Sequence, residues 1–181
     1  SDHRRQRQMC IRDSPVIFGL VTFVFGTLVG SFLNVVILRL PLILEQTWQE
    51  DAALILGEAP KAKARVTLWG PRSACPSCSS TIRAYDNIPV VSFLLLRGRC
   101  RDCSTRISLR YPLIELLTGF VTLGLLIVLG WDTTFAAALI LSYGLIALTF
   151  IDFDQQILPD QITLPGMWIA LLLNLNGIFC S

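Results

Sequence analysis

Four cysteines lie in two closely spaced pairs, and thiols at this spacing are typical ligands of a structural metal ion. The pairs are Cys75-Pro-Ser-Cys78 and Cys100-Arg-Asp-Cys103, with 21 residues between them. One CxxC turn presents two thiolates to an ion, and two such turns complete a tetrahedral shell. Four unrelated free thiols, or a redox pair, would be the alternative. We predict that Cys75, Cys78, Cys100 and Cys103 bind a structural zinc ion that holds their loop together.

Three carboxylates follow an apolar run in the segment 150–160, which reads Phe-Ile-Asp-Phe-Asp-Gln-Gln-Ile-Leu-Pro-Asp. Carboxylates at the depth of a bilayer are costly and tend to mark function. Asp160 follows a proline and precedes an apolar run, so it is typical of a helix N-cap or turn. Asp154 can lie in interfacial water. Asp152 is closest to the helix body and is the best candidate for a partly buried catalytic acid, but aspartic protease chemistry needs two carboxylates that share a proton.

Glu115 is a further carboxylate, at the start of the next apolar run after the cysteines. The simpler interpretation is a charge in the first helical turn that complements the helix dipole. The alternative is a polar contact to a cofactor or substrate.

The composition indicates that these groups belong to a membrane protein. Of the 181 residues, 53% are hydrophobic and only 15% are charged, whereas soluble domains carry about 25% charged residues. All 15 lysines and arginines precede residue 111, so the remainder could not form an ordinary soluble surface. The net charge of +2 gives no indication of nucleic-acid binding, and we expect none.

The elements that must position these residues are four apolar runs. The first, 15–38, is long enough to cross a hydrocarbon core and too long for the apolar part of a signal peptide. Residues 112–181 hold three more runs, at 112–131, 133–151 and about 164–180. The expected fold class is therefore an all-α polytopic membrane protein, with about four transmembrane helices. A cytoplasmic loop at 39–111 would carry the zinc-binding cysteines.

Small residues in the first run indicate how it packs. Their spacing lets a second helix approach closely; they are Gly19, Gly26, Gly30 and Ser31. Asn34 is the one amide of this run, and we expect it to face the bundle.

The distribution of basic residues predicts the orientation. The segment 39–110 carries eleven lysines and arginines against six acidic residues, and such loops stay in the cytoplasm. Residues 1–14 hold four arginines on the opposite side, which conflicts with this rule. Because QMCIRDS within them resembles translated sequencing-adapter sequence, we expect 1–14 to be a non-native or disordered leader.

Three blocks of the sequence together resemble the prepilin peptidase family, the type IV prepilin leader peptidase/N-methyltransferases. The first block is Gly30-Ser-Phe-Leu-Asn-Val-Val-Ile-Leu-Arg-Leu-Pro41. The second runs from Cys75 through Asp86-Asn-Ile-Pro89 and Leu96-Arg-Gly-Arg-Cys100 to Ile107-Ser-Leu-Arg-Tyr-Pro-Leu-Ile-Glu115. The third is Ile151-Asp-Phe-Asp-Gln-Gln-Ile-Leu-Pro-Asp-Gln-Ile-Thr-Leu-Pro165. The resemblance covers about residues 16–176.

The resemblance implies an aspartic endopeptidase of the bacterial inner membrane. Family members cut the leader from type IV prepilins and pseudopilins, which serve pili or type II secretion, and many methylate the new N-terminus from S-adenosylmethionine. Asp152 matches the first catalytic aspartate. The second belongs to a Gly-x-Gly-Asp motif that does not occur in this sequence, so we expect a truncated peptidase domain that is inactive as a protease by itself. The resemblance assigns no residues to S-adenosylmethionine.

Two other functions remain open at this point. A non-enzymatic zinc-binding membrane module for assembly or interaction would have the same composition and the same cysteine pairs. A family member that methylates without cleaving is the other possibility.

Overall fold

The computed structural model describes residues 15–57, 65–70, 72–75, 77–83, 86 and 88–175. Its helices are α2 (Pro15–Leu56), α3 (Val91–Leu95), α4 (Arg110–Leu129), α5 (Thr133–Gln155) and α6 (Asp160–Leu175). Within this described part there is no β-strand, apart from two isolated bridges. The predicted leader, residues 1–14, lies outside the described residues.

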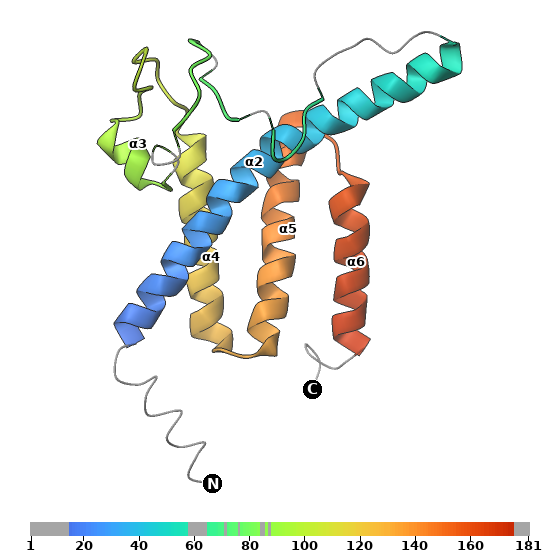
Figure 1. Cartoon of the computed structure of the whole chain (residues 1–181). Helices are drawn as coiled ribbons and strands as arrows, with labels where there is room; N and C mark the ends of the chain where they lie inside the picture. The colour runs from blue at the N-terminus through green and yellow to red at the C-terminus, as the bar shows by residue number, and fades with distance from the viewer. Residues whose placement is uncertain are drawn as a thin grey trace.

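Three helices, α2, α4 and α5, are long and apolar enough to cross a membrane. The helices α4, α5 and α6 stand side by side, and α2 crosses α4 obliquely and also contacts α5 (Figure 1). Much of their outer surface is apolar and exposed, as at Leu20, Phe120 and Leu172. Such a surface suits contact with lipid. The predicted all-α membrane fold is therefore confirmed, and the fourth apolar run corresponds to α6, whose predicted end at 180 lies beyond the described residues.

The helix α2 is longer than the apolar run that predicts it. We expect a membrane helix at 15–38 followed by a polar loop, but the helix continues without interruption to Leu56. Pro41 lies inside it and removes one backbone donor. The residues that follow, rich in leucine, alanine, glutamate and glutamine, are good helix formers. The second half of α2 is therefore an extension of mixed polar and apolar residues beyond the apolar run.

Small residues allow α2 and α4 to pack backbone against backbone. A Cβ atom on Gly26 would lie 2.8 Å from the Cα of Gly119, and one on Gly30 would lie 2.8 Å from the Cα of Glu115. Larger side chains would force the helices apart. The predicted close approach at this stripe of small residues is confirmed at Gly26 and Gly30.

The apolar core lies beside this crossing and joins α2, α4 and α5. Its buried members come from all three helices; they are Leu33, Ile37, Ile114, Ile146, Ala147 and Ile151. Asn34, also buried, donates a hydrogen bond from Nδ2 to the Tyr111 carbonyl oxygen at 3.1 Å. The expectation that Asn34 faces the bundle is thus confirmed, and it ties α2 to the start of α4.

Candidate functional site

The two cysteine pairs lie in equivalent turns of the loop that precedes α4. In the first, the Cys75 N–H donates to the Ser80 carbonyl and the Ser79 N–H donates to the Cys75 carbonyl, both at 2.9 Å. In the second, the Cys100 N–H donates to the Thr105 carbonyl at 2.8 Å and the Ser104 N–H donates to the Cys100 carbonyl at 3.0 Å. Ser79 and Ser104 both have φ of 57°. The sequence spacing thus produces the same local fold twice.

These turns bring four thiols together. The Sγ atoms of Cys75, Cys78, Cys100 and Cys103 all lie within 4.8 Å of one another, and those of Cys75 and Cys103 are 3.7 Å apart. A tetrahedral ion with metal–sulfur bonds of ~2.3 Å holds its sulfurs ~3.8 Å apart. The four residues therefore form a cluster that could hold a metal ion.

Local hydrogen bonds favour the thiolate forms that bind metal. The Thr105 hydroxyl, 3.2 Å from the Sγ of Cys103, and the Thr105 backbone N–H lower the pKa of Cys103 to about 6. Backbone N–H groups of Cys78 and Ser77 lower the pKa of Cys75. The Ser80 N–H also acts to lower the pKa of Cys78, but burial and the three neighbouring thiols raise it to about 12. A bound cation would favour loss of this remaining proton as well.

A cavity of about 640 Å³ separates the cysteine cluster from the membrane helices. Its walls come from the first half of α2, from the loop that carries the four cysteines (the cysteine loop), from α3 and from the start of α4. Five arginines line it; they are Arg39, Arg72, Arg83, Arg101 and Arg106. Pockets of this size take ligands as large as a nucleoside derivative. Sequence reasoning missed this cavity because its walls are distant in the chain.

Glu115 lies in the wall of this cavity, where the loop meets α4. It is only 7% exposed, and its Oε2 accepts a hydrogen bond from the Val90 N–H at 2.7 Å. The first turn of α4 contains no acidic residue, so the interpretation of Glu115 as a charge in that turn is wrong. The helix begins at Arg110 instead, which places Glu115 deeper, between α2 and the loop.

The three aspartates of segment 150–160 have different surroundings. Asp154 forms an ion pair with Arg110 of α4. Asp160 is the first residue of α6, one position after the N-cap position predicted for it, because the Thr163 N–H donates to the carbonyl of Pro159. Asp152 is exposed, so the expectation that it is partly buried is wrong. It lies in the last turn of α5, beyond the buried Ile151, where the other helices no longer cover it.

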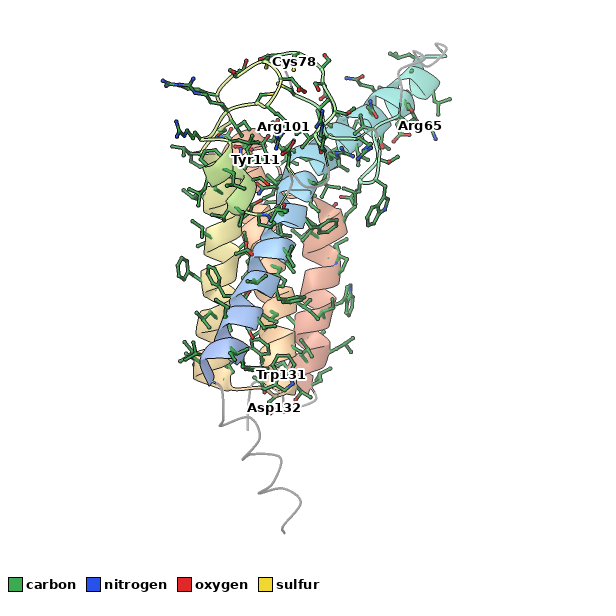
Figure 2. The ribbon with its side chains drawn as sticks, turned by 60° about the vertical axis from the view of Figure 1, so that its left-hand side comes forward. Arg65, Cys78, Arg101, Tyr111, Trp131 and Asp132 are labelled. Carbon is green, nitrogen blue, oxygen red and sulfur yellow. The ribbon has the colours of Figure 1, made fainter. Side chains whose placement is uncertain are left out.

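The cysteine loop and the aspartates occupy the same end of the helix bundle. Cys78, Arg101 and Tyr111 lie at the end opposite to Trp131 and Asp132 (Figure 2). The ion pair between Arg110 and Asp154 joins the start of α4 to the end of α5 at the end of the bundle where Tyr111 lies. The predicted metal ligands and the predicted catalytic aspartate therefore share one end of the helix bundle, but Asp152 is not among the residues that line the cavity.

Comparison with known proteins relates the chain to one family. The model described as Bacterial Peptidase A24 N-terminal domain matches residues 24–129, and the Type IV leader peptidase family matches residues 139–181. No solved structure matches.

Relatives named "Prepilin leader peptidase/N-methyltransferase" are similar over most of this chain. The one from Aeromonas salmonicida is 47% identical over 168 residues, which are 90% of this chain and 57% of the relative. The one from Neisseria gonorrhoeae is 52% identical over 159 residues, 86% of this chain and 55% of the relative. The chain thus spans little more than half the length of these relatives. Since one family model alone covers more than half of the sequence, the chain belongs to the bacterial peptidase A24 family, the type IV leader peptidases.

Proposed function

We propose that this chain provides the methyltransferase loop and one catalytic aspartate of a prepilin leader peptidase/N-methyltransferase. The observation that carries the proposal is the common location of the cysteine-loop cavity and the segment of Asp152 at one end of the helix bundle. A membrane-embedded substrate could meet both sites from the same side. The names of the relatives support the pairing of the two activities.

In the peptidase reaction, Asp152 would be one of two carboxylates that share a proton. One carboxylate activates a water molecule and the other protonates the leaving amine. Asp152 is exposed and can receive a second carboxylate beside it. Asp154 is already paired with Arg110, which makes it a poorer candidate. The second aspartate would come from a Gly-x-Gly-Asp motif, as in the family that the sequence resembles.

In the methylation reaction, the cavity would bind S-adenosylmethionine and the new N-terminus of the cut protein. Phe93 and Tyr111 line the cavity and can stack on an adenine ring, and the arginines can bind a carboxylate. Zinc is the ion we assign to the four cysteines. A closed shell of four thiolates stabilises the loop and leaves no position for chemistry.

The substrates would be type IV prepilins or pseudopilins of pili or type II secretion. The proposed location is the bacterial inner membrane, with the basic cysteine loop in the cytoplasm. By the same rule the turn at Trp131 and Asp132 faces the other side.

The test is a chimera in which this chain is joined to the C-terminal part of the Aeromonas salmonicida relative, to supply the second aspartate. With a prepilin in membranes, we expect leader cleavage followed by methylation. Asp152→Asn should lower cleavage more than about 100-fold, the usual contribution of a general acid or base, and leave methylation of a pre-cut pilin unchanged. Asp51→Asn, at an exposed carboxylate of α2, is the control and should retain cleavage.

The results separate the competing functions. Cleavage by the Asp152→Asn chimera would remove Asp152 from the mechanism. Methylation without cleavage by the unsubstituted chimera would favour a methyltransferase that does not cleave. Absence of both activities, in a chimera that binds zinc and inserts in the membrane, would favour the non-enzymatic zinc-binding module.

A further inference from the structure

The carboxylate of Glu115 is buried against a cavity and has neutral partners. Its Oε2 accepts the Val90 N–H at 2.7 Å, and the Ser31 hydroxyl also hydrogen-bonds to it. In the part of the chain that the structure describes, the environment of the Glu115 carboxylate consists mainly of its burial and of these two hydrogen-bond donors. No cation balances this carboxylate there, although five arginines line the same cavity.

A buried carboxylate without a counter-charge is costly. Removing an ionised group from water carries a penalty that neutral donors offset only in part. A positively charged ligand at this end of the cavity would offset more of it. Asp86, which lines the same cavity, differs because its carboxylate is hydrogen-bonded by Arg101 at 3.0 Å. Asp102, the third carboxylate of the cavity wall, is exposed to water and accepts a hydrogen bond from the Ser80 hydroxyl. Of the three, Glu115 is therefore the buried carboxylate that has no cationic partner among the described residues and is left to bind a cationic ligand.

The depth of Glu115 suits a ligand that arrives from the membrane. It lies five residues after Arg110, the first residue of α4, which is ~7.5 Å along the helix axis. Gly30 of α2 lies directly against its Cα. The carboxylate therefore lies where the loop cavity meets the membrane helices, within reach of the end of a membrane-embedded segment.

We propose that Glu115 binds the ammonium group of a methylation reactant at the membrane end of this cavity. The inference rests on the proposed methyltransferase function. Two reactants offer this chemistry: the N-terminus of the cut protein, and the amino-acid part of S-adenosylmethionine. The arginines of the cavity would bind a carboxylate of the same ligand or of its partner.

If the ligand is the N-terminus, the carboxylate also has a chemical role. Glu115 accepts one proton from the ammonium and leaves a neutral amine. The amine lone pair then forms the N–C bond to the methyl group as the C–S bond breaks, and the bonding electrons of that bond stay on sulfur. The product is a methylated ammonium beside a neutral thioether.

The test compares Glu115→Gln with Glu45→Gln. The glutamine oxygen can still accept the Val90 N–H, so the substitution removes the charge and keeps the loop contact. Glu45 is an exposed carboxylate of α2 that accepts a hydrogen bond from Gln49, which makes it a matched control. The measurements are KM and kcat for methylation of a pilin N-terminal peptide, the dissociation constant of S-adenosylmethionine, and bound zinc.

We expect Glu115→Gln to weaken the binding of one reactant at least tenfold, while that of the other reactant and the zinc content change less than twofold. A raised KM for the peptide identifies the N-terminus as the bound ammonium; a raised dissociation constant identifies S-adenosylmethionine. Unchanged values for both would overturn the role of Glu115 and leave the proposed function intact. Absence of methylation in the unsubstituted protein would instead overturn the proposed function.

A second measurement needs no substitution, in case Glu115→Gln fails to fold. An N-acetylated peptide and an S-adenosylhomocysteine without its amino group are neutral at the proposed position. One of them should bind at least tenfold more weakly than its amino counterpart. Equal binding within both pairs would overturn the proposal.

Discussion

Arg110, the first residue of α4, forms an ion pair with Asp154 in the last turn of α5. Its guanidinium also donates to the Phe150 carbonyl oxygen at 3.3 Å and lies 5.4 Å from the centre of the Phe150 ring. Residues two apart on a helix do not share a face, so the contact that holds Asp154 leaves Asp152 directed elsewhere. One arginine thus fixes the end of the helix that carries the proposed catalytic aspartate.

Replacing Arg110 by glutamine should loosen this end of α5. We expect a loss of about 1 kcal/mol in the free energy of unfolding, since partly exposed ion pairs contribute little more. The matched control is Arg65→Gln, which removes the ion pair between Arg65 and Glu50, whose side chains are 80% and 41% exposed. Unfolding in detergent, followed by circular dichroism, measures both. An equal effect of the two substitutions would contradict the special role of Arg110.

Removal of one cysteine should release the metal. Cys75→Ser takes away the buried member of the cluster, and three thiolates bind far more weakly than four. We expect about one zinc per chain in the unsubstituted protein and none in the variant, with a lower yield of folded protein. Ser77→Ala, in the same turn, should keep the metal. Elemental analysis of the purified proteins measures zinc per chain. Retained zinc in Cys75→Ser would disprove the four-cysteine site.

The crossing of α2 and α4 should not tolerate even one added methyl group. In Gly30→Ala the new Cβ would lie 2.8 Å from the Cα of Glu115 and 3.0 Å from Thr118, and such overpacking costs about 1–3 kcal/mol. Gly124→Ala is the control, because nothing lies within 4 Å of its Cβ. The thermal midpoint in detergent should fall for the first variant and stay or rise for the second. A midpoint for Gly30→Ala that stays or rises with that of Gly124→Ala would contradict the tight packing at Gly30, because alanine favours a helix more than glycine does.

The contact between Asp86 and Arg101 should make part of the loop stability depend on pH. Hydrogen bonds from Arg101 lower the pKa of Asp86 below its ordinary value. Because the folded pKa is the lower one, this stabilisation is present above about pH 4 and is lost as the pH falls through the folded pKa. The difference in thermal midpoint between the unsubstituted protein and Asp86→Asn should therefore be largest at neutral pH and shrink as the pH falls below about 4, the ordinary pKa of an aspartate. The same difference at both pH values would contradict the assignment.

Local patterns in the sequence predicted the parts of the site that depend on short-range geometry. The cysteine pairs predicted the two turns correctly because each turn is closed by backbone hydrogen bonds between residues close in sequence, as between Cys75 and Ser80. The small residues at Gly26 and Gly30 predicted a close helix neighbour because steric demand is itself local. Hydropathy located the membrane helices for the same reason.

The features that the sequence did not predict depend on contacts that sequence patterns do not reveal. Nothing near Asp154 in the sequence shows that Arg110 pairs with it, because this contact depends on how α4 and α5 pack. The end of α2 was misplaced because hydropathy stops at residue 38, whereas backbone hydrogen bonding continues to Leu56. Glu115 was misassigned since its true partner, the Val90 N–H, lies in the folded loop.

Because α2 is one continuous helix, a change in its tilt within the membrane would also move the loop that is attached to its far half. From its crossing point at Gly30 to its end at Leu56 it extends ~39 Å. The loop is attached along this arm, since the Val66 N–H donates to Gln46 and Arg65 pairs with Glu50. A change in tilt of about 10°, of the kind that bilayer thickness imposes on membrane helices, would move the far end by ~7 Å. The thickness of the surrounding membrane would therefore influence how the loop covers its cavity.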